Sequence, residues 1–201
     1  MHRATWIFTG IFLTFASSWL GLVYFPHIQL KDLQSQQDTA TGALHPAPFS
    51  TLEALGRDVY AQEGCHYCHS QQVRGGRFNA DLNRGWGARR SHPRDYIYDN
   101  PQMLGTMRTG PDLANIGVRQ PSAEWHHLHL YDPQITSPGS IMPPYPYLYK
   151  KQRIEGEPSP DALKLEGKWA VEADHEVVPT ERARALVAYL KRLDQSYEIE
   201  N

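Results

Sequence analysis

The 201-residue chain has little of several things, and each scarcity excludes a class of protein. Its only two cysteines, Cys65 and Cys68, are too few and too close together for a scaffold held by disulfide bonds. It has no excess of positive charge, since 20 Lys and Arg stand against 22 Asp and Glu, which argues against a nucleic-acid-binding protein. A mean hydropathy of −0.56 excludes a protein with many membrane spans. Fifteen prolines and fifteen glycines instead indicate a loop-rich domain with short helices.

One long hydrophobic segment lies near the start of the chain. From Ala4 to Phe25 there is no charged residue, and 15 of these 22 positions are apolar. As a helix this segment is about 33 Å long, enough to cross a bilayer core of about 30 Å. A cleaved signal peptide is the alternative, but the apolar run exceeds roughly 15 residues and no small-residue cleavage site follows it. We predict a transmembrane helix over residues 4–25, ended by Pro26.

The charges that flank this helix indicate its orientation only weakly. His2, Arg3 and the terminal amine precede it, which favours a cytoplasmic N-terminus over residues 1–3 and export of the rest of the chain. Residues 26–48 are polar and rich in Gln, Ser and Thr, so they predict a linker. Residues 49–201 are then the exported domain.

Two helices are expected at the ends of this domain. Ser50 and Glu53 make a capping box that starts one helix, and Gly64 ends it as a left-handed residue. A second helix is expected over residues 180–193, with Thr180 as its cap and leucines that repeat at helical spacing. Alternation within residues 163–178 suggests a β-hairpin. The remaining chain reads as loops and short helical turns, so the predicted fold is mostly α-helical.

All the cysteine in the chain lies in the sequence CHYCH, at residues 65–69. This C-x-x-C-H pattern is the attachment signature of c-type haem. Two thiols about one helical turn apart can add to the two vinyl groups at one edge of a porphyrin, and the histidine that follows reaches the iron. We therefore predict that Cys65 and Cys68 bind haem covalently and that His69 is an axial ligand.

Two alternatives to haem use the same cysteine pair. A zinc site needs about four ligands, so two of His126, His127 and His129 would have to complete it. A redox dithiol usually sits on a βαβ scaffold, which this sequence does not show. Haem is the favoured interpretation because the motif follows a capped helix behind a membrane anchor.

A methionine is expected as the second axial ligand, because a thioether stabilises ferrous iron and raises the reduction potential. Met142 is favoured because prolines at positions 138, 143, 144 and 146 stiffen its loop. Met103 and Met107 are the other candidates, and their simpler interpretation is core packing. A histidine from residues 126–129 is the alternative ligand, and it predicts a lower potential.

Four blocks of the sequence resemble one known family. They are LGRDVYAQEGCHYCHSQQVR (55–74), RTGPDLANIG (108–117), EWHHLHLYDP (124–133) and SIMPPYPYL (140–148). In this order, behind an N-terminal anchor, they resemble the mono-haem subunit of cbb3-type cytochrome c oxidases, the FixO family. The resemblance covers nearly the whole chain. Residues 75–100 and 150–178 depart from the family pattern, and we expect both to touch partner subunits.

The resemblance implies a class I cytochrome c-like haem domain with loop insertions, tethered by one N-terminal transmembrane helix. It implies one haem c, joined by thioether bonds to Cys65 and Cys68, with His69 and Met142 as axial ligands. The carbonyl of Pro111 is expected to accept a hydrogen bond from the His69 imidazole, which would fix the tautomer of the ring.

The resemblance also implies a role and partners. The chain would relay single electrons to a catalytic haem–copper subunit that reduces oxygen to water, beside other cytochrome c subunits. It would lie in the inner membrane, in contact with the lipid bilayer, with its haem domain in the periplasm, no nucleic-acid partner and no active site of its own. Arg74 and Arg108 are candidates to bind haem propionates, the alternative for each being a solvated surface charge. Two other functions remain open: the haem c subunit of a nitric oxide reductase, and a membrane-tethered haem sensor.

Overall fold

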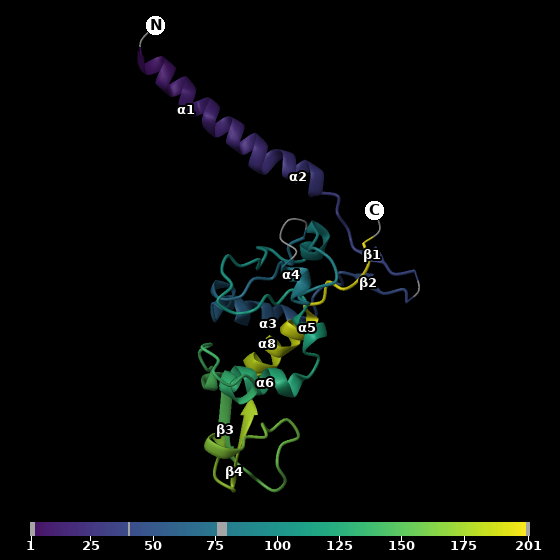
Figure 1. Cartoon of the computed structure of the whole chain (residues 1–201), viewed down its shortest axis with the longest axis vertical. Coiled ribbons are helices and arrows are strands. Elements are labelled where there is room, and N and C mark those ends of the chain that lie inside the picture. Colours follow the sequence, from purple (N-terminus) through teal and green to yellow (C-terminus); the bar gives the residue numbers. More distant parts are fainter. Residues whose placement is uncertain (1–2, 40, 76–79, 200–201) are drawn as a thin grey trace. The chain divides into compact units, whose positions relative to one another are not determined.

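The computed structural model describes residues 3–39, 41–75 and 80–199. The chain divides into two compact units, one up to His45 and the other from Pro46 onward. Helices make up most of the regular structure, and the described β-structure consists of two short two-stranded sheets (Figure 1). The predicted fold class, mostly α-helical with one apolar N-terminal helix, is confirmed.

A continuous helix from Arg3 to Leu30 makes up most of the first unit. Its parts are α1 (Arg3–Trp19), a π-helical turn η1 (Leu20–Tyr24) and α2 (Phe25–Leu30). Its 28 residues extend for about 42 Å, and its length and composition suit a membrane span. A small antiparallel hairpin of β1 (Gln36–Gln37) and β2 (Leu44–His45) follows it. Residues 1 and 2 of the predicted cytoplasmic segment lie outside the described residues.

The prediction that Pro26 ends this helix is wrong, since α2 continues past it to Leu30. The π-helical turn immediately before the proline explains the difference. In that turn the N–H of Phe25 donates to the carbonyl of Leu20, five residues back. Because this turn uses a hydrogen bond to the fifth residue back, the helix continues although Pro26 has no N–H group to donate. Residues 26–30 are therefore helical, and the polar segment begins after them.

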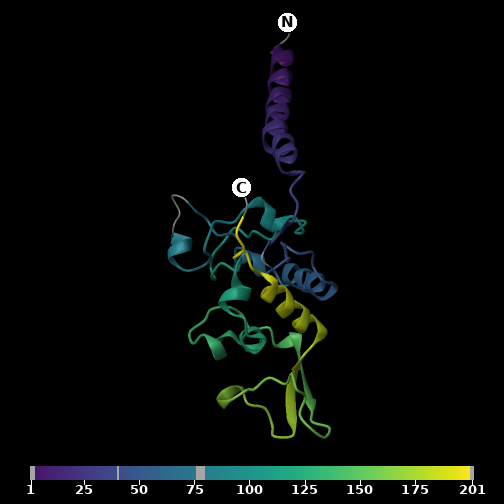
Figure 2. The same cartoon turned by 90° about the vertical axis from the view of Figure 1, so that its right-hand side faces the viewer.

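Two helices, α3 (Thr51–Gln62) and α8 (Glu181–Arg192), cross at the centre of the second unit (Figures 1 and 2). The capping box of Ser50 and Glu53 at the start of α3 is confirmed, and so is the cap of Thr180 on α8. Gly64 has a φ of 72°, the left-handed conformation expected where the chain leaves α3. Local sequence signals therefore place both helix starts.

The crossing of α3 and α8 brings their backbones into contact. A Cβ atom on Gly56 would overlap the carbonyl group of Ala185, so only glycine fits at this point. The core lies around it: Val59, Tyr60 and Tyr189 are buried, and the two tyrosine rings lie 5.4 Å apart between centroids. This contact fixes one wall of the cavity described below.

Shorter helices and loops complete the second unit. They are η2 (Cys65–Tyr67), α4 (Ala80–Asn83), η4 (Pro93–Tyr96), α5 (Ile116–Arg119), α6 (Ala123–Tyr131), α7 (Pro133–Thr136), η5 (Pro146–Leu148) and η6 (Gly167–Trp169). Residues 76–79, within the stretch that departs from the family pattern, lie outside the described residues.

The sheet of the second unit differs from the prediction. The strand β4 (His175–Pro179) pairs antiparallel with β3 (Tyr149–Arg153), so the hairpin expected within residues 163–178 is wrong. The leucines that alternate in that segment, Leu163 and Leu165, pack against the hydrophobic core instead. In both views the β3–β4 hairpin lies at one end of the second unit, beyond α6 (Figures 1 and 2).

Candidate functional site

A cavity of about 620 Å³ lies within the second unit, a size typical of cofactor sites. Its walls come from α3, α6, α8 and the loops around residues 109–113 and 137–143. Tyr60, Leu130, Leu186 and Leu190 give it an apolar interior. The five residues of the favoured haem site line it together: Cys65, Cys68, His69, Pro111 and Met142. Segments about 70 residues apart in the sequence therefore meet at one site.

The two cysteines lie on the tight turn that follows Gly64. The N–H groups of Cys68 and His69 both donate to the carbonyl of Cys65, at 3.2 and 3.0 Å, so all three side chains leave one compact turn. Burial raises the pKa of the Cys65 thiol to about 12. Among the described residues, no βαβ unit surrounds this turn, whereas a redox dithiol usually lies on such a scaffold.

His69 is oriented from behind by a backbone carbonyl. Its Nδ1 lies 2.7 Å from the carbonyl oxygen of Pro111, the contact that the resemblance led us to expect. A carbonyl can only accept, so Nδ1 carries the proton and Nε2 keeps a free lone pair. Burial lowers the pKa of the imidazole, which favours the neutral ring that binds metals. A Cβ atom on Gly110 would overlap this ring, so glycine is needed there.

A buried carboxylate fixes the two loops that hold His69 and Pro111. Asp112 is fully buried and accepts hydrogen bonds from the hydroxyl of Ser70 at 2.6 Å and from the N–H of Gln72 at 2.8 Å. The N–H of Ala114 donates to its other oxygen at 2.8 Å. Because Ser70 follows His69 and Asp112 follows Pro111, these bonds hold the imidazole and its carbonyl partner in register.

Arg74 and Arg108 lie apart from the cavity. Both pair with Asp81, which is fully buried: Arg74 Nε lies 3.0 Å and Arg108 NH1 2.8 Å from its carboxylate oxygens. Arg108 also donates to the hydroxyl of Ser70 at 2.7 Å, and its guanidinium lies over the ring of Trp86. The structure therefore does not bring these two arginines together with the other candidate residues.

Of the three candidate methionines, only Met142 lines the cavity. Its N–H donates to the hydroxyl of Ser140 at 3.2 Å, and the N–H of Tyr145 ties the end of the loop to the carbonyl of Leu130 at 2.9 Å. Met103 is buried in the core, as its simpler interpretation predicted. Met107 is exposed, so core packing is the wrong prediction for it.

Two of the histidines on α6 also line the cavity, His126 and His129. His126 places Nε2 2.8 Å from the carbonyl of Gln120. His129 places Nδ1 2.6 Å from the hydroxyl of Thr136 and stacks on the ring of Trp125 at 4.6 Å. Burial lowers the pKa of His129 to about 4. Both histidines therefore line the cavity with one ring nitrogen hydrogen-bonded to the protein.

His127 lies outside the cavity wall, with Nδ1 3.2 Å from the hydroxyl of Tyr149. Among residues 3–39, 41–75 and 80–199, no group of three or more His, Cys, Asp or Glu side chains has the arrangement of a metal site. The described histidines therefore do not complete a zinc site with the cysteine pair.

One wall residue is not among those singled out in the sequence. Arg119, at the end of α5, is the permanently charged side chain among the described residues of the lining. Its Nε is buried without a hydrogen-bond partner in the described structure. It stands two positions after the block RTGPDLANIG (108–117), and the fold brings it to the cavity.

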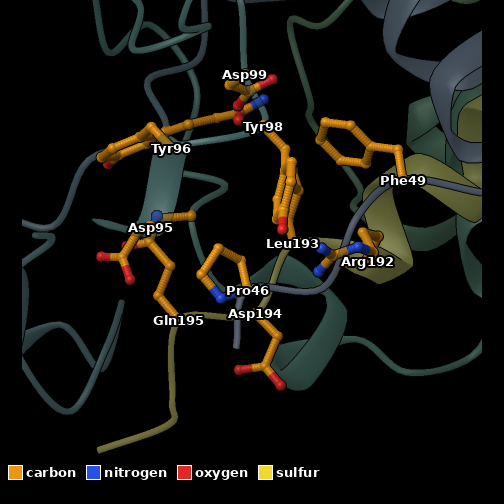
Figure 3. A pocket seen from close by; sticks show the side chains of 12 residues that line it. Pro46, Phe49, Asp95, Tyr96, Tyr98, Asp99, Arg192, Leu193, Asp194 and Gln195 are labelled. Carbon is orange, nitrogen blue, oxygen red and sulfur yellow. The ribbon is translucent and has the colours of Figure 1, made fainter. Parts of the chain in front are cut away.

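A second hollow, of about 40 Å³, lies between residues 46–49 and the end of α8 (Figure 3). It has room for only a few water molecules. Arg192 borders it, with its guanidinium 5.4 Å from the ring centroid of Phe49 and a hydrogen bond to the carbonyl of Ala47. These contacts attach the start of the second unit to α8, which is a structural role.

A comparison with protein families agrees with the site. The chain matches the family described as cytochrome C oxidase, mono-heme subunit/FixO, over residues 6–172. It belongs to the FixO family. The match covers most of the apolar helix and the cavity-lining segments up to Tyr145, but not Leu186 and Leu190 of α8. Members of this family are subunits of a cytochrome c oxidase and carry one haem. No curated protein matches the chain.

Proposed function

We propose that this FixO chain is the membrane-anchored c-type cytochrome of a cbb3-type oxidase and that it passes electrons one at a time to the catalytic haem–copper subunit. The convergence of Cys65, Cys68, His69 and Met142 on one apolar cavity carries the proposal. The helix Arg3–Leu30 would anchor the chain in the inner membrane, with the haem domain on the periplasmic side.

The residues of the cavity fit a covalently held haem. Cys65 and Cys68 would form the thioethers, and the free lone pair of His69 and the Met142 thioether would hold the iron. When bound, the haem supplies a one-electron couple. The apolar side chains around it keep water away, which limits the reorganisation that accompanies a change of charge.

The protein's own contribution is to hold both ligands with little freedom to move. The Pro111 carbonyl fixes the tautomer and the orientation of the imidazole, and a hydrogen bond at the far nitrogen strengthens its donor atom. On the other side, the proline-rich loop limits the conformations open to Met142. Because both His69 and Met142 would hold the iron, the haem would supply transfer of electrons without catalysis.

The full chain, produced in a host competent for cytochrome maturation, tests this function. We expect a haem that resists denaturation, an alkaline pyridine spectrum typical of two thioethers, and no binding of carbon monoxide at neutral pH. Cys68→Ala should lose normal two-thioether attachment, whereas Ser137→Ala, a change elsewhere in the cavity wall, should keep it. Ready carbon monoxide binding by the reduced wild-type chain would instead favour a haem sensor.

The partner subunit is tested by co-purification of the anchored chain from membranes. A copper-containing haem subunit in the purified complex is the expected partner. Recovery with a haem subunit that lacks copper and reduces nitric oxide would contradict the proposed assignment and support the nitric oxide reductase alternative.

A further inference from the structure

A cluster of arginines surrounds the buried carboxylate of Asp81. Arg74 and Arg108 both pair with this carboxylate, as described above. Arg84 joins the cluster through the ring of Trp86: its guanidinium lies 4.9 Å from the ring centroid, and that of Arg108 lies 5.0 Å from it. One carboxylate therefore stands against three guanidinium groups at this place.

Arg90 extends the cluster on the side of Arg74. A Cβ atom on Gly75 would lie 2.9 Å from the Cβ of Arg90, so the two segments pack side by side. The N–H of Ser91 also donates to the carbonyl of Val73 at 2.8 Å. We refer to four residues together as the arginine face: Arg74, Arg84, Arg90 and Arg108.

Two members of the arginine face are available to bind an anion. Arg84 and Arg90 are exposed, and within the part of the chain that the structure describes neither guanidinium forms an ion pair. The sequence of residues 76–79 contains no acidic residue either. A guanidinium stays charged at neutral pH and matches the geometry of a phosphate group. The arginine face therefore suits a partner that carries phosphate groups.

The arginine face lies beside the point where the chain enters the second unit. The hydroxyl of Ser91 donates to the side-chain carbonyl of Gln195 at 2.5 Å, and Arg89 pairs with Asp95 at 2.7 Å. Gln195 and Asp95 line the small hollow together with Pro46, the first residue of this unit (Figure 3). The segment that carries Arg90 is thus attached to the start of the second unit.

The chain between the apolar helix and Pro46 has a short reach. Residues 31–35 separate the end of α2 from the β1–β2 hairpin, and five extended residues span at most about 18 Å. In the hairpin Gln36 pairs with His45, so the chain returns to where the hairpin began. Pro46 follows His45 directly. If the apolar helix spans a membrane, this connection keeps Pro46 within reach of the bilayer surface.

We propose that the arginine face binds the headgroups of anionic phospholipids, an inference that rests on the proposed function only for the membrane anchor. Phosphate groups suit its free guanidinium groups, and Trp86 is the kind of side chain that favours the interface between lipid and water. The position beside Pro46 favours lipid over the subunit contact expected for residues 75–100. With the helix as a first attachment, this second one would limit the orientations of the haem domain on the membrane.

Arginine modification of the full, haem-loaded chain in vesicles tests the contact. The chain is placed in vesicles of phosphatidylcholine alone, or of equal parts phosphatidylcholine and phosphatidylglycerol. Phenylglyoxal is added, and peptide mapping gives the rate at which each arginine reacts. The internal control is Arg153, which is exposed in the β3–β4 hairpin, at the end of the second unit remote from α4 (Figures 1 and 2).

We expect Arg84 and Arg90 to react about fivefold more slowly in the vesicles that contain phosphatidylglycerol, because each arginine near an anionic surface strengthens binding by about this factor. At a salt concentration of about 1 M the screening length falls to about 3 Å, so the rates should recover. Arg153 should react at the same rate in both kinds of vesicle.

Variants at one position test whether the charges act together. Arg90→Gln should lower the ratio of bound to unbound domain about fivefold, so Arg84 should lose most of its protection in the mixed vesicles. Arg90→Lys keeps the charge and should keep most of this protection. Arg153→Gln is the matched control, since it removes the same charge from an exposed position and should leave Arg84 protected.

Equal rates for Arg84 and Arg90 in the two kinds of vesicle would overturn the inference. Protection that ignores salt, or that arises only when the catalytic subunit is present, would show a protein partner and would also contradict it. Equal slowing of Arg153 would show a general effect of the charged surface. A chain that does not float with the vesicles in a density gradient would refute the membrane anchor itself, whereas a floating chain with equal rates refutes only the lipid contact.

Discussion

The two walls of the cavity that carry the proposed iron ligands are built differently. On the His69 side, buried side chains bind one another through many short contacts, with Asp112 and Asp81 at their centres. On the Met142 side, the loop is partly exposed, with Ile141 83 % exposed, and it depends on prolines and a few backbone hydrogen bonds. Hydrogen bonds and ion pairs hold the first wall in place. The prolines of the second wall act mainly by limiting the conformations open to the chain.

This difference suggests that the protein fixes the position of His69 more firmly than that of Met142. The histidine side is complete without the cofactor, because its carbonyl, carboxylate and glycine already define where the imidazole lies. The methionine side has fewer fixed contacts, so the bond from sulfur to iron would itself contribute to its order. Substitutions in the first wall should therefore lower the free energy of unfolding more than comparable substitutions in the second wall.

Removing the buried carboxylate of the first wall should have the largest effect. Asp112→Ala leaves the hydroxyl of Ser70 and the N–H groups of Gln72 and Ala114 without their acceptor. We expect a loss of about 3–5 kcal/mol in the free energy of unfolding. Urea denaturation of the full chain measures it.

The matched control for this change is Asp161→Ala, which breaks a half-exposed ion pair with Arg184. Exposed pairs contribute less than about 1 kcal/mol, so the control should remain close to the wild type. Equal losses in the two variants would contradict the claim that Asp112 organises the His69 wall.

Acid should weaken the helix behind the second wall. Burial lowers the pKa of His127 to about 4, against about 6.5 in an unfolded chain. Between these pH values the unfolded chain binds a proton that the folded chain does not, so stability is full above pH 6.5 and falls as the pH drops toward 4. The loss attributable to His127 is at most about 3 kcal/mol.

Urea denaturation at several pH values compares the wild type with His127→Gln, which cannot take up this proton. The variant should lose less stability than the wild type between pH 6.5 and 4. Parallel curves for the two chains would show that His127 does not titrate on unfolding.

A pair of glycines compares the two walls directly. In Gly110→Ala the new methyl group would overlap the His69 ring, and overpacking of this kind costs about 1–3 kcal/mol. In Gly139→Ala the methyl group meets open space, and the cost is about 1 kcal/mol of strain from a φ of 82°.

We expect only Gly110→Ala to disturb binding of the iron by histidine, as seen in the haem absorption and electron paramagnetic resonance spectra. A normal spectrum for Gly110→Ala together with an altered one for Gly139→Ala would reverse the proposed order of rigidity.

The smallest effect is expected from relaxing the methionine loop. Pro144→Ala increases the freedom of the unfolded chain and should cost about 0.4–1 kcal/mol. The weak red absorption band of methionine-bound ferric haem should disappear at a lower temperature than in the wild type. Pro158→Ala, in an exposed loop remote from the cavity lining, is the control and should leave that temperature unchanged.

Sequence patterns predicted the parts of the molecule that are governed by local chemistry. A capping box at Ser50, a left-handed glycine at position 64 and a cap at Thr180 each involve residues a few positions apart, and all three are present. The candidate ligands Cys65 and His69 were likewise visible in one short motif.

Features that depend on distant partners were missed or misplaced. The strand His175–Pro179 pairs with Tyr149–Arg153, and alternation within one segment cannot reveal which distant strand it meets. The sequence alone does not show the π-helical turn that allows the helix to continue past Pro26. The sequence does not distinguish the surroundings of Arg108 from those of Arg119. The fold shows that Arg108 binds Asp81 and that Arg119 reaches the cavity.

The intact mass of the mature full chain under denaturing conditions tests the central claim most directly. If Cys65 and Cys68 bind the cofactor covalently, the mass will equal that of the polypeptide plus one haem, and neither thiol will react with an alkylating reagent. A chain matured in a competent host that has the mass of the bare polypeptide, with both thiols alkylated, would contradict the account.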